Sequence, residues 1–404
     1  MQTFFVDYVG CSRRSLDCER AKNYLLGNGF TQTGSPKKAD YSFIFTCGFH
    51  KSKEDDSIAL IKKCKKNNGD LIVCGCLPIM NPERLKSVFD GRTITTKDMN
   101  TIDELFPHFR YKFKSSPDAN WLFMNKNSEE ISVLKKYRGL IHDLPKRIMR
   151  KLKYSLIGDK AAHEFEHILP DKKVFTIRIA EGCLGNCSYC NVRKAVGRLR
   201  SKPTQTIMEE VKKGLSKGIY RFNIISPDTG AYGLDMGADI ISLINAILDE
   251  NKKIVIEYLE DVKAIYICRY KKGFIDLVES GRIKKMVIPV ESARKRILKL
   301  MRRPCDLESL QEIVANMKKK NHALRLASRV MIGFPTETEE DFQATIDYMK
   351  TSPFEEIDVH HYHETGKTDS SNIYPKVDHR IIRERAEMLK EELSDTMQIN
   401  PDPT

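Results

Sequence analysis

Three cysteines that stand close together in the sequence are the residues whose spacing most clearly indicates chemistry. Cys183, Cys187 and Cys190 form a CxxxCxxC pattern, and Gly182 and Gly185 ease a tight turn of the chain around it. Cubane iron–sulfur clusters normally take four thiolates, so three leave one iron open to another ligand. A zinc site would more often show a fourth Cys or His nearby. The pattern therefore predicts a catalytic [4Fe–4S] cluster with an open iron.

The elements around these cysteines predict how they are positioned. Strands and helices alternate six times from Val174 onward, which favours an open, TIM-like barrel of parallel strands. The expected strands are Val174–Ala180, Arg221–Ser226, Ile254–Tyr258, Lys285–Val290, Leu326–Ile332 and Glu356–His360. The expected helices are 204–217, 236–251, 273–280, 293–301, 307–321 and 337–350. Such barrels place chemistry on the loops after the strands, and the cysteines follow the first strand.

A CxxxCxxC loop with an aromatic residue, here Tyr189, before its last cysteine and after the first strand of such a barrel resembles the radical S-adenosylmethionine superfamily. The resemblance implies that the open iron binds the amino and carboxylate groups of S-adenosylmethionine. One electron then yields methionine and a 5′-deoxyadenosyl radical, which removes a hydrogen atom from an unactivated carbon. Tyr189 is implied to flank the adenine, and flavodoxin or ferredoxin is the kind of reductant implied.

Further segments resemble one subgroup, the methylthiotransferase family that acts on tRNA adenosine and on ribosomal protein S12. They follow the cysteine loop in the order typical of that family. These segments are Arg193–Ser201, Ser226–Gly233, Pro289–Arg294 with Leu298–Arg303, and Ile332–Phe342. A single one of them also fits an ordinary junction between a strand and a helix, but together they make the resemblance specific.

Five residues of the barrel are candidates for contacts with S-adenosylmethionine. Asp228 and Glu291 stand at strand ends, and a carboxylate can accept hydrogen bonds from a ribose diol; either could instead cap a helix or form an ion pair. Ser292 and Gly333 lie in segments that carry the resemblance. Arg329 is a charged residue in an expected core strand, so it needs a carboxylate partner, which could come from S-adenosylmethionine, the substrate or the protein itself.

The N-terminal region has three cysteines that each follow an expected strand. Cys11, Cys47 and Cys76 come after strands expected over Thr3–Val9, Tyr41–Thr46 and Asp70–Cys74, with helices expected over 15–28, 52–67 and 81–89. Parallel strands end at one edge of a sheet, so the three thiols could converge there, although three ordinary buried cysteines would show the same spacing.

The resemblance favours convergence, because methylthiotransferases bind an auxiliary [4Fe–4S] cluster through cysteines in these contexts, with Cys74 as the alternative to Cys76. In that family the auxiliary cluster holds the sulfur that one S-adenosylmethionine methylates, before the substrate radical takes up the methylthio group. The remaining cysteines, Cys18, Cys64, Cys268 and Cys305, are expected to be structural.

The composition fits an intracellular iron–sulfur enzyme. The 404 residues carry a net charge of +13, with the basic residues spread along the chain; this fits solvated helix faces or an anionic partner. The count of 11 cysteines is odd and no export signal or membrane span is evident, so cluster ligation is favoured over disulfides and the cytoplasm is the expected location.

Four regions are expected: an α/β domain over 1–107, a mostly helical linker or insertion over 108–172, the barrel over 173–378, and a helix with a tail over 379–404.

The substrate is predicted from where the resemblance stops. Characterised family members continue after the last helix into a small TRAM-type β-barrel, whereas this chain ends at Thr404. The chain also has Glu291 where Gln is frequent, Arg329 near a frequent Asp, and Val192 and Arg193 where the family usually has Pro. The missing module weakens the case for tRNA and favours methylthiolation of a ribosomally synthesised precursor peptide, at an Asp side chain by analogy with the S12 enzyme, with residues 108–172 binding its leader. The alternatives are tRNA methylthiolation, radical chemistry without sulfur insertion, and a non-catalytic iron–sulfur scaffold or sensor.

Overall fold

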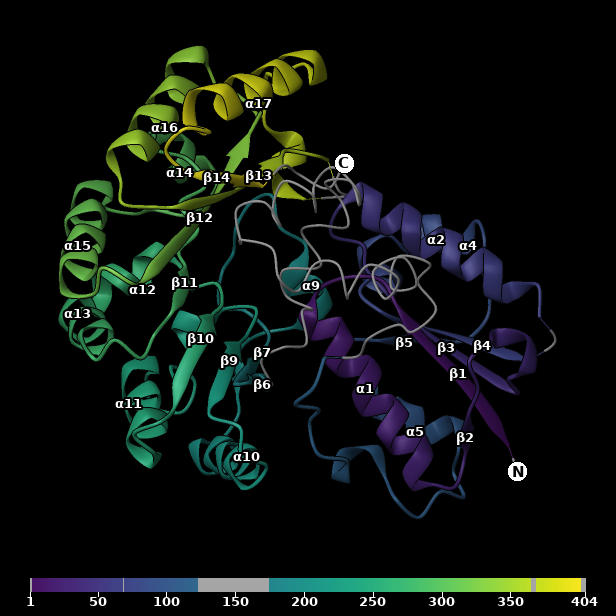
Figure 1. Ribbon diagram of the computed structural model, residues 1–404. Helices are drawn as coiled ribbons and strands as arrows, with labels where there is room; N and C mark the ends of the chain where they lie inside the picture. Colours follow the sequence, from purple (N-terminus) through teal and green to yellow (C-terminus); the bar gives the residue numbers. More distant parts are fainter. Residues whose placement is uncertain (1, 68, 123–173, 365–367, 401–404) are drawn as a thin grey trace, which may run out of the picture.

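The chain folds into two α/β domains that lie side by side in the computed structural model (Figure 1). The structure describes residues 2–67, 69–122, 174–364 and 368–400. Within these ranges, no helix combines the length and the apolar character that crossing a membrane requires. The helical pieces expected over 128–138 and 144–156 fall outside the described residues.

The N-terminal domain is built on a parallel five-stranded sheet in the order β2-β1-β3-β4-β5. Its strands are β1 (Thr3–Tyr8), β2 (Thr31–Gln32), β3 (Tyr41–Thr46), β4 (Asp70–Gly75) and β5 (Thr93–Thr95). Its helices are α1 (Ser12–Gly27), α2 (Lys51–Lys65), α3 (Leu77–Met80), α4 (Pro82–Lys86) and α5 (Ile102–Leu105). The central strands are apolar on both faces because helices cover both sides of the sheet.

The segment after this sheet continues the packing of the first domain. Phe109 and Phe113 are buried and lie against Tyr24 of α1, with ring centroids 5.6 and 5.4 Å away. These residues belong to the stretch expected to begin an insertion at 108. The helix expected over 81–89 is the shorter α4, which begins at Pro82 because Asn81 caps it, and α3 precedes it as a separate helix.

The second domain is the expected open barrel, with parallel strands in the order β14-β13-β12-β11-β10-β9-β6. These strands are β6 (Val174–Arg178), β9 (Arg221–Ile225), β10 (Val255–Leu259), β11 (Lys285–Val287), β12 (Arg325–Ile332), β13 (Glu356–His361) and β14 (Gln398–Asn400). The helices are α9 (Val192–Val196), α10 (Thr204–Ser216), α11 (Ile240–Glu250), α12 (Ala264–Arg269), α13 (Lys271–Glu279), α14 (Lys295–Leu300), α15 (Leu307–Lys320), α16 (Glu339–Thr351) and α17 (His379–Leu393).

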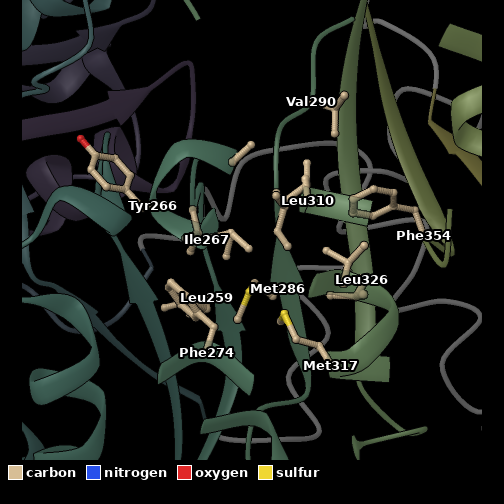
Figure 2. Close-up of a cluster of buried hydrophobic side chains, with 14 of the residues drawn as sticks. Leu259, Tyr266, Ile267, Phe274, Met286, Val290, Leu310, Met317, Leu326 and Phe354 are labelled. Atoms are coloured by element: carbon tan, nitrogen blue, oxygen red, sulfur yellow. The ribbon is translucent and has the colours of Figure 1, made fainter. Parts of the chain in front are cut away.

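The barrel core lies between the strands and the outer helices. Figure 2 shows Leu259, Met286 and Leu326 from three neighbouring strands beside Phe274 of α13 and Met317 of α15. All five side chains are fully buried. This packing fixes the strand ends, where the chemistry is expected.

Two short elements add to the predicted barrel. A two-stranded antiparallel ribbon of β7 (Ala180–Glu181) and β8 (Arg200–Ser201) closes the cysteine loop at its base. After α17, β14 pairs in parallel with β13, so the tail expected at this point includes a seventh strand of the sheet. Three residues are too few to give a periodic pattern in the sequence.

The two domains are held together by a buried ion pair and a small apolar contact. Arg178 at the end of β6 lies 2.6 Å from Asp17 of α1 and 2.6 Å from Asp118, and its side chain is 4% exposed. Although burial opposes the charge, Arg178 holds the pKa of Asp118 well below its usual range. Leu16 and Ile225 are packed in one apolar cluster beside this ion pair. The interface therefore joins α1, which begins after Cys11, to the strand that leads into the cysteine loop.

Candidate active site

The loop that carries the CxxxCxxC pattern is anchored by its backbone. Gly182 has φ +76°, and a Cβ at this position would lie 1.8 Å from the carbonyl oxygen of Arg198, so only glycine fits. Cys183 donates its N–H to the carbonyl oxygen of Gly197 at 3.2 Å. Ser188 donates through its backbone N–H and its hydroxyl to carbonyl oxygens at the end of α14, at 3.1 and 2.7 Å. These bonds fix the path of the chain around the three thiols.

The sulfur atoms of this loop already accept hydrogen bonds. Gly185 donates its N–H to Cys183 Sγ at 3.2 Å, and Val192 donates to Cys190 Sγ at 3.4 Å. Burial, with Asp228 nearby, raises the pKa of Cys183 to about 11; burial, with Cys187 nearby, raises that of Cys190 to about 12. Cys183 and Cys190 therefore hold their protons at neutral pH until a metal displaces them.

Asp228 stands beside this loop, after β9, and is fully buried. Its Oδ2 accepts from Leu184 N at 3.1 Å and from Lys263 Nζ at 2.8 Å. Its Oδ1 is buried and has no hydrogen-bond partner. A buried carboxylate oxygen without a donor is costly, and a ribose hydroxyl would supply that donor. The residues present therefore fit S-adenosylmethionine at the position expected for Asp228.

A second group of side chains lies on the other side of the loop. Arg303 binds Glu291 at 3.0 Å and donates to the hydroxyl of Tyr189 at 3.3 Å. Burial holds the pKa of Tyr189 well above its usual value. The ring of Tyr189 meets that of Phe334 edge-on, at 6.4 Å between centroids. The structure thus brings together two predicted contacts, Tyr189 and Glu291, through an arginine that was not predicted.

Three other candidates already have protein partners. Ser292 Oγ accepts from Arg294 N at 3.3 Å. Gly333 donates its N–H to Glu337 at 2.7 Å, and a Cβ there would lie 2.3 Å from the side chain of Ile382. Arg329 pairs with Asp261 and Asp358, so its carboxylate partners come from the protein itself, which was one of the three sources expected. Their roles toward S-adenosylmethionine stay predictions.

The N-terminal cysteines converge at one edge of the first sheet. Cys11, Cys47 and Cys76 follow β1, β3 and β4, which are neighbours in the sheet. Burial raises the pKa of Cys47 to about 12, and the nearby thiols of Cys76 and Cys11 add to this rise. Gly10, at φ +135°, lets the chain pass Cys47, because a Cβ there would lie 3.2 Å from that of Cys47.

The structure also separates the two cysteines at the end of β4. Cys74 is fully buried in the core beside Cys18, whereas Cys76 packs at the domain interface against α9. The buried guanidinium of Arg14 lies near Cys11 and Cys76 and is held by Thr96 at 2.9 Å and by Asp17 at 2.7 Å. Cys76, not Cys74, therefore stands with the other two thiols.

Both sets of thiols fit a cubane better than a single ion. Among the residues that the structure describes, no three His, Cys, Asp or Glu side chains converge tightly enough to hold one metal ion. Each thiolate of a cubane binds a different iron, so its ligands stand farther apart. Three thiolates in each group would suit a cluster that keeps one open iron.

Arg13 links the two groups of thiols. It follows Cys11 by two residues, donates to Glu260 at 2.8 Å and to the carbonyl oxygen of Ser226 at 3.3 Å, and lies near Asp261. Ser226 precedes Asp228 on the same loop. Arg13 therefore connects the segment of Cys11 to the loop that carries Asp228, and α3 and α9 pack together at the same domain interface.

Four basic residues of this arrangement were not predicted from the sequence: Arg13, Arg14, Lys263 and Arg303. Lys263 follows the end of β10, and Arg303 belongs to the segment Leu298–Arg303 that carried the family resemblance. These positions in the sequence could have indicated that both residues belong to the site. Arg13 and Arg14 are close to Cys11, but nothing in the sequence indicates their contacts. The partners of Arg13 come from the barrel, whereas those of Arg14, Asp17 and Thr96, lie in its own domain.

Comparison with known protein families agrees with this architecture. Residues 177–349 match the model of the radical SAM superfamily. Residues 3–95 match that of the uncharacterized protein family UPF0004. The first match covers the barrel with its cysteine loop, and the second covers the sheet that carries Cys11, Cys47 and Cys76.

Curated relatives align over nearly the whole chain. The ribosomal protein uS12 methylthiotransferase RimO of Chlamydia felis is 25% identical over 390 residues, which cover 95% of this chain and 76% of the relative. RimO of Prosthecochloris aestuarii is 28% identical over 405 residues, covering 97% and 81%. A probable threonylcarbamoyladenosine tRNA methylthiotransferase of Methanocaldococcus jannaschii is 26% identical over 389 residues, covering 95% and 81%.

Solved structures show the same fold at low sequence identity. The radical S-adenosylmethionine methyltransferase TsrM from Kitasatospora setae superposes with a TM-score of 0.59 at 10% identity, covering 89% of this chain and 75% of TsrM. That likeness concerns the fold alone. The family match over residues 177–349 and the curated relatives identify the protein as a radical S-adenosylmethionine enzyme. Within that superfamily the chain belongs to the methylthiotransferase family, whose members use S-adenosylmethionine and [4Fe–4S] clusters.

Proposed function

We propose that this enzyme inserts a methylthio group at an unactivated carbon of a polypeptide, specifically an Asp side chain in a ribosomally synthesised precursor peptide. The observation that supports the proposal is the contact of Arg13, which lies close to Cys11, with Glu260 and with the loop of Ser226 and Asp228 in the barrel. Sulfur insertion needs a sulfur source next to a radical source. This arrangement provides ligands for both.

The roles of the residues follow from their contacts. When bound, S-adenosylmethionine and the [4Fe–4S] clusters supply the hydrogen-abstracting radical, the methyl group and the sulfur. Cys183, Cys187 and Cys190 would hold the radical cluster, and Cys11 and its two partners the auxiliary one. Asp228 Oδ1 would accept a hydrogen bond from the ribose, since it is the buried oxygen without a partner.

Other side chains shape and close the site. The ring of Tyr189, fixed by Arg303, offers a flat apolar face for the adenine. Apolar packing of α9 against Met80 and Cys76 keeps water out between the two groups of thiols. Residues on both sides of the domain interface therefore position the reacting groups together.

The charge between the two sites favours a polypeptide substrate. Glu260, Asp261 and Asp358 supply three carboxylates there, against the guanidinium groups of Arg13 and Arg329. A polyanionic RNA backbone would be repelled by such a balance, because RNA sites are lined by excess positive charge. Relatives that are named for a ribosomal protein substrate agree with this choice.

A tRNA substrate is the second candidate. The net charge of +13 and the probable tRNA methylthiotransferase among the relatives favour it. Binding of tRNA would weaken steeply with salt, because each neutralised phosphate releases counterions. A peptide held mainly by side-chain contacts would show a much smaller dependence.

Counting iron and sulfide in protein purified and reconstituted without oxygen tests the two-cluster proposal. We expect about eight irons per chain in the native protein. We expect about four in a Cys183/Cys187/Cys190→Ala variant and about four in a Cys11/Cys47/Cys76→Ala variant. A Cys18/Cys64/Cys74→Ala variant serves as the matched control and should keep about eight. About four irons in the native protein would contradict the auxiliary cluster and, with it, sulfur insertion.

The substrate is tested in the same reconstituted protein. With reduced flavodoxin as the electron donor and S-adenosylmethionine present, a candidate peptide encoded beside the enzyme should gain about 46 Da, the replacement of hydrogen by a methylthio group. Unmodified tRNA is assayed in parallel for methylthioadenosine. Gain of mass by the tRNA alone would replace the peptide proposal with the second candidate. Such oxygen-labile clusters suit an anaerobic cytoplasm.

A further inference from the structure

Lys263 is the residue of the radical site whose position neither the motif nor the family match explains. It stands between β10 and α12, and its side chain is 14% exposed. The backbone is fixed on both sides, because Val262 donates to the carbonyl oxygen of Val287 at 2.9 Å and Tyr266 donates to that of Lys263 at 2.9 Å. The side chain therefore projects from a rigid junction at the end of a barrel strand.

The ammonium group of Lys263 touches two members of the site at once. Its Nζ lies 2.8 Å from Asp228 Oδ2 and 3.2 Å from Cys183 Sγ. Gly185 leaves room for it, since a Cβ at that residue would lie 2.6 Å from Nζ. Within the described structure, Lys263 is thus a charged side-chain donor aimed at a candidate ligand sulfur, in addition to the backbone donor of Gly185.

A charged donor on a ligand sulfur changes the electron affinity of an iron–sulfur cluster. Hydrogen bonds to the sulfurs and the local net charge are among the factors that set the reduction potential. Reduction adds one electron from an external donor such as reduced flavodoxin, and a nearby positive charge stabilises the electron-richer state. Solvent screens this charge little because the group is largely buried, while the carboxylate of Asp228, 3.4 Å from the same sulfur, offsets part of it.

We propose that Lys263 is a positioning residue that raises the reduction potential of the radical cluster through its hydrogen bond to Cys183 Sγ, with Asp228 holding the ammonium in place. This inference rests on the proposed function, because it takes Cys183 as a cluster ligand. Lys263 makes electron delivery easier without contacting the substrate. Asp228 then has two tasks, one for each carboxylate oxygen: Oδ2 for Lys263 and Oδ1 for the ribose.

The test is a redox titration followed by electron paramagnetic resonance. The full-length chain with Cys11/Cys47/Cys76→Ala serves as the background, so that only the radical cluster contributes to the signal. Lys263→Met removes both charge and donor, Lys263→Gln removes the charge and keeps an N–H donor, and the exposed Lys299→Met in the same barrel is the matched control. Iron is counted in every sample, and S-adenosylmethionine affinity is measured from the change in the signal on adding it.

We expect Lys263→Met to lower the ratio of reduced to oxidised cluster at a fixed potential about tenfold, which is about 59 mV for a one-electron couple. Lys263→Gln should fall between it and the background, and Lys299→Met should match the background. If Lys263→Met takes up less iron, Lys263→Gln carries the measurement.

Three results would overturn the proposal. One is an unchanged potential in both Lys263 variants. Another is an unchanged potential together with weakened S-adenosylmethionine binding, which would make Lys263 a contact of the carboxylate of that molecule. The last is loss of iron from both variants, which would make Lys263 a structural residue. If the background protein itself holds no cluster, it is the proposed function that fails.

Discussion

The two groups of cysteines reach similar arrangements by different routes. Cys183, Cys187 and Cys190 lie on one loop, whose shape is set by its own glycines and by nearby backbone hydrogen bonds. The three N-terminal thiols lie at the ends of β1, β3 and β4 and come together only when the sheet has formed. The barrel site is therefore encoded locally, and the auxiliary site is encoded by tertiary structure. The first should tolerate changes in distant packing better than the second.

The largest expected effect separates the chemistry of the two sites. Cys183→Ala should abolish formation of 5′-deoxyadenosine, because the radical cluster loses a ligand. Cys76→Ala should keep that activity and lose methylthiolation. Chromatography of 5′-deoxyadenosine, with mass spectrometry of the substrate, measures both. Loss of 5′-deoxyadenosine in both variants would show that the two sites do not function separately.

The next effect concerns the buried ion pair of Arg178 at the interface between the two domains. Arg178→Met removes the buried cation that Asp17 and Asp118 share and leaves them only Arg14 and Lys202, so we expect a loss of about 3 kcal/mol in the free energy of unfolding, the lower end for a broken buried ion pair. Urea denaturation followed by the fluorescence of Trp121 measures it, since this single tryptophan packs on Phe175 of β6, 5.5 Å between ring centroids.

Arg200→Met is the control for this change. Arg200 is 55% exposed and pairs with Glu181 at 2.7 Å, on the same segment of the chain. An exposed ion pair contributes at most about 1 kcal/mol. Equal losses in the two variants would argue against a special role of the buried interface.

A smaller effect compares one glycine from each site. Gly182→Ala places a Cβ 1.8 Å from a backbone oxygen at φ +76°, whereas Gly10→Ala meets only side-chain carbons at 3.2 Å, at φ +135°. Strain of about 1–3 kcal/mol is expected for a positive φ alone, with the backbone clash in addition at Gly182. Iron counts should fall further in Gly182→Ala. The reverse order would contradict the view that the loop itself shapes the barrel site.

The smallest effect tests the choice between neighbouring cysteines. Cys74→Ala removes a buried core thiol and should cost about 1 kcal/mol of stability. It should leave the iron content unchanged, unlike Cys76→Ala. Thermal denaturation and iron assays on the pair decide this. Loss of iron from Cys74→Ala alone would reassign the ligand.

The local route explains why the barrel site could be predicted from the sequence. The three cysteines of this loop have a recognisable spacing in the sequence. The apolar patterns of the six barrel strands predicted the fold class, and the structure confirmed it. The N-terminal sheet was also recognisable, but its sequence left Cys74 and Cys76 as alternatives. Only the course of β4 shows which of the two faces the interface.

Other features could not be predicted because their partners lie far away in the sequence. In the sequence, Arg13 is indistinguishable from an ordinary basic residue of a helix. Only the structure shows that it pairs with Glu260 of the other domain, 2.8 Å away. The position of Lys263 after a strand was visible in the sequence, but its contacts with Cys183 and Asp228 depend on the fold. The strand β14 is too short for a pattern and forms because β13 offers a free edge.

The ion pair across the domain interface has a consequence for recombination between related genes. A crossover placed between Asp118 and Arg178 would combine the acidic partners of one parent with the basic partner of another. Where the parents differ at these positions, the hybrid inherits a buried charge that has lost one of its partners. Functional chimeras of such enzymes should therefore be those whose parents agree at Asp17, Asp118 and Arg178, whatever their overall similarity.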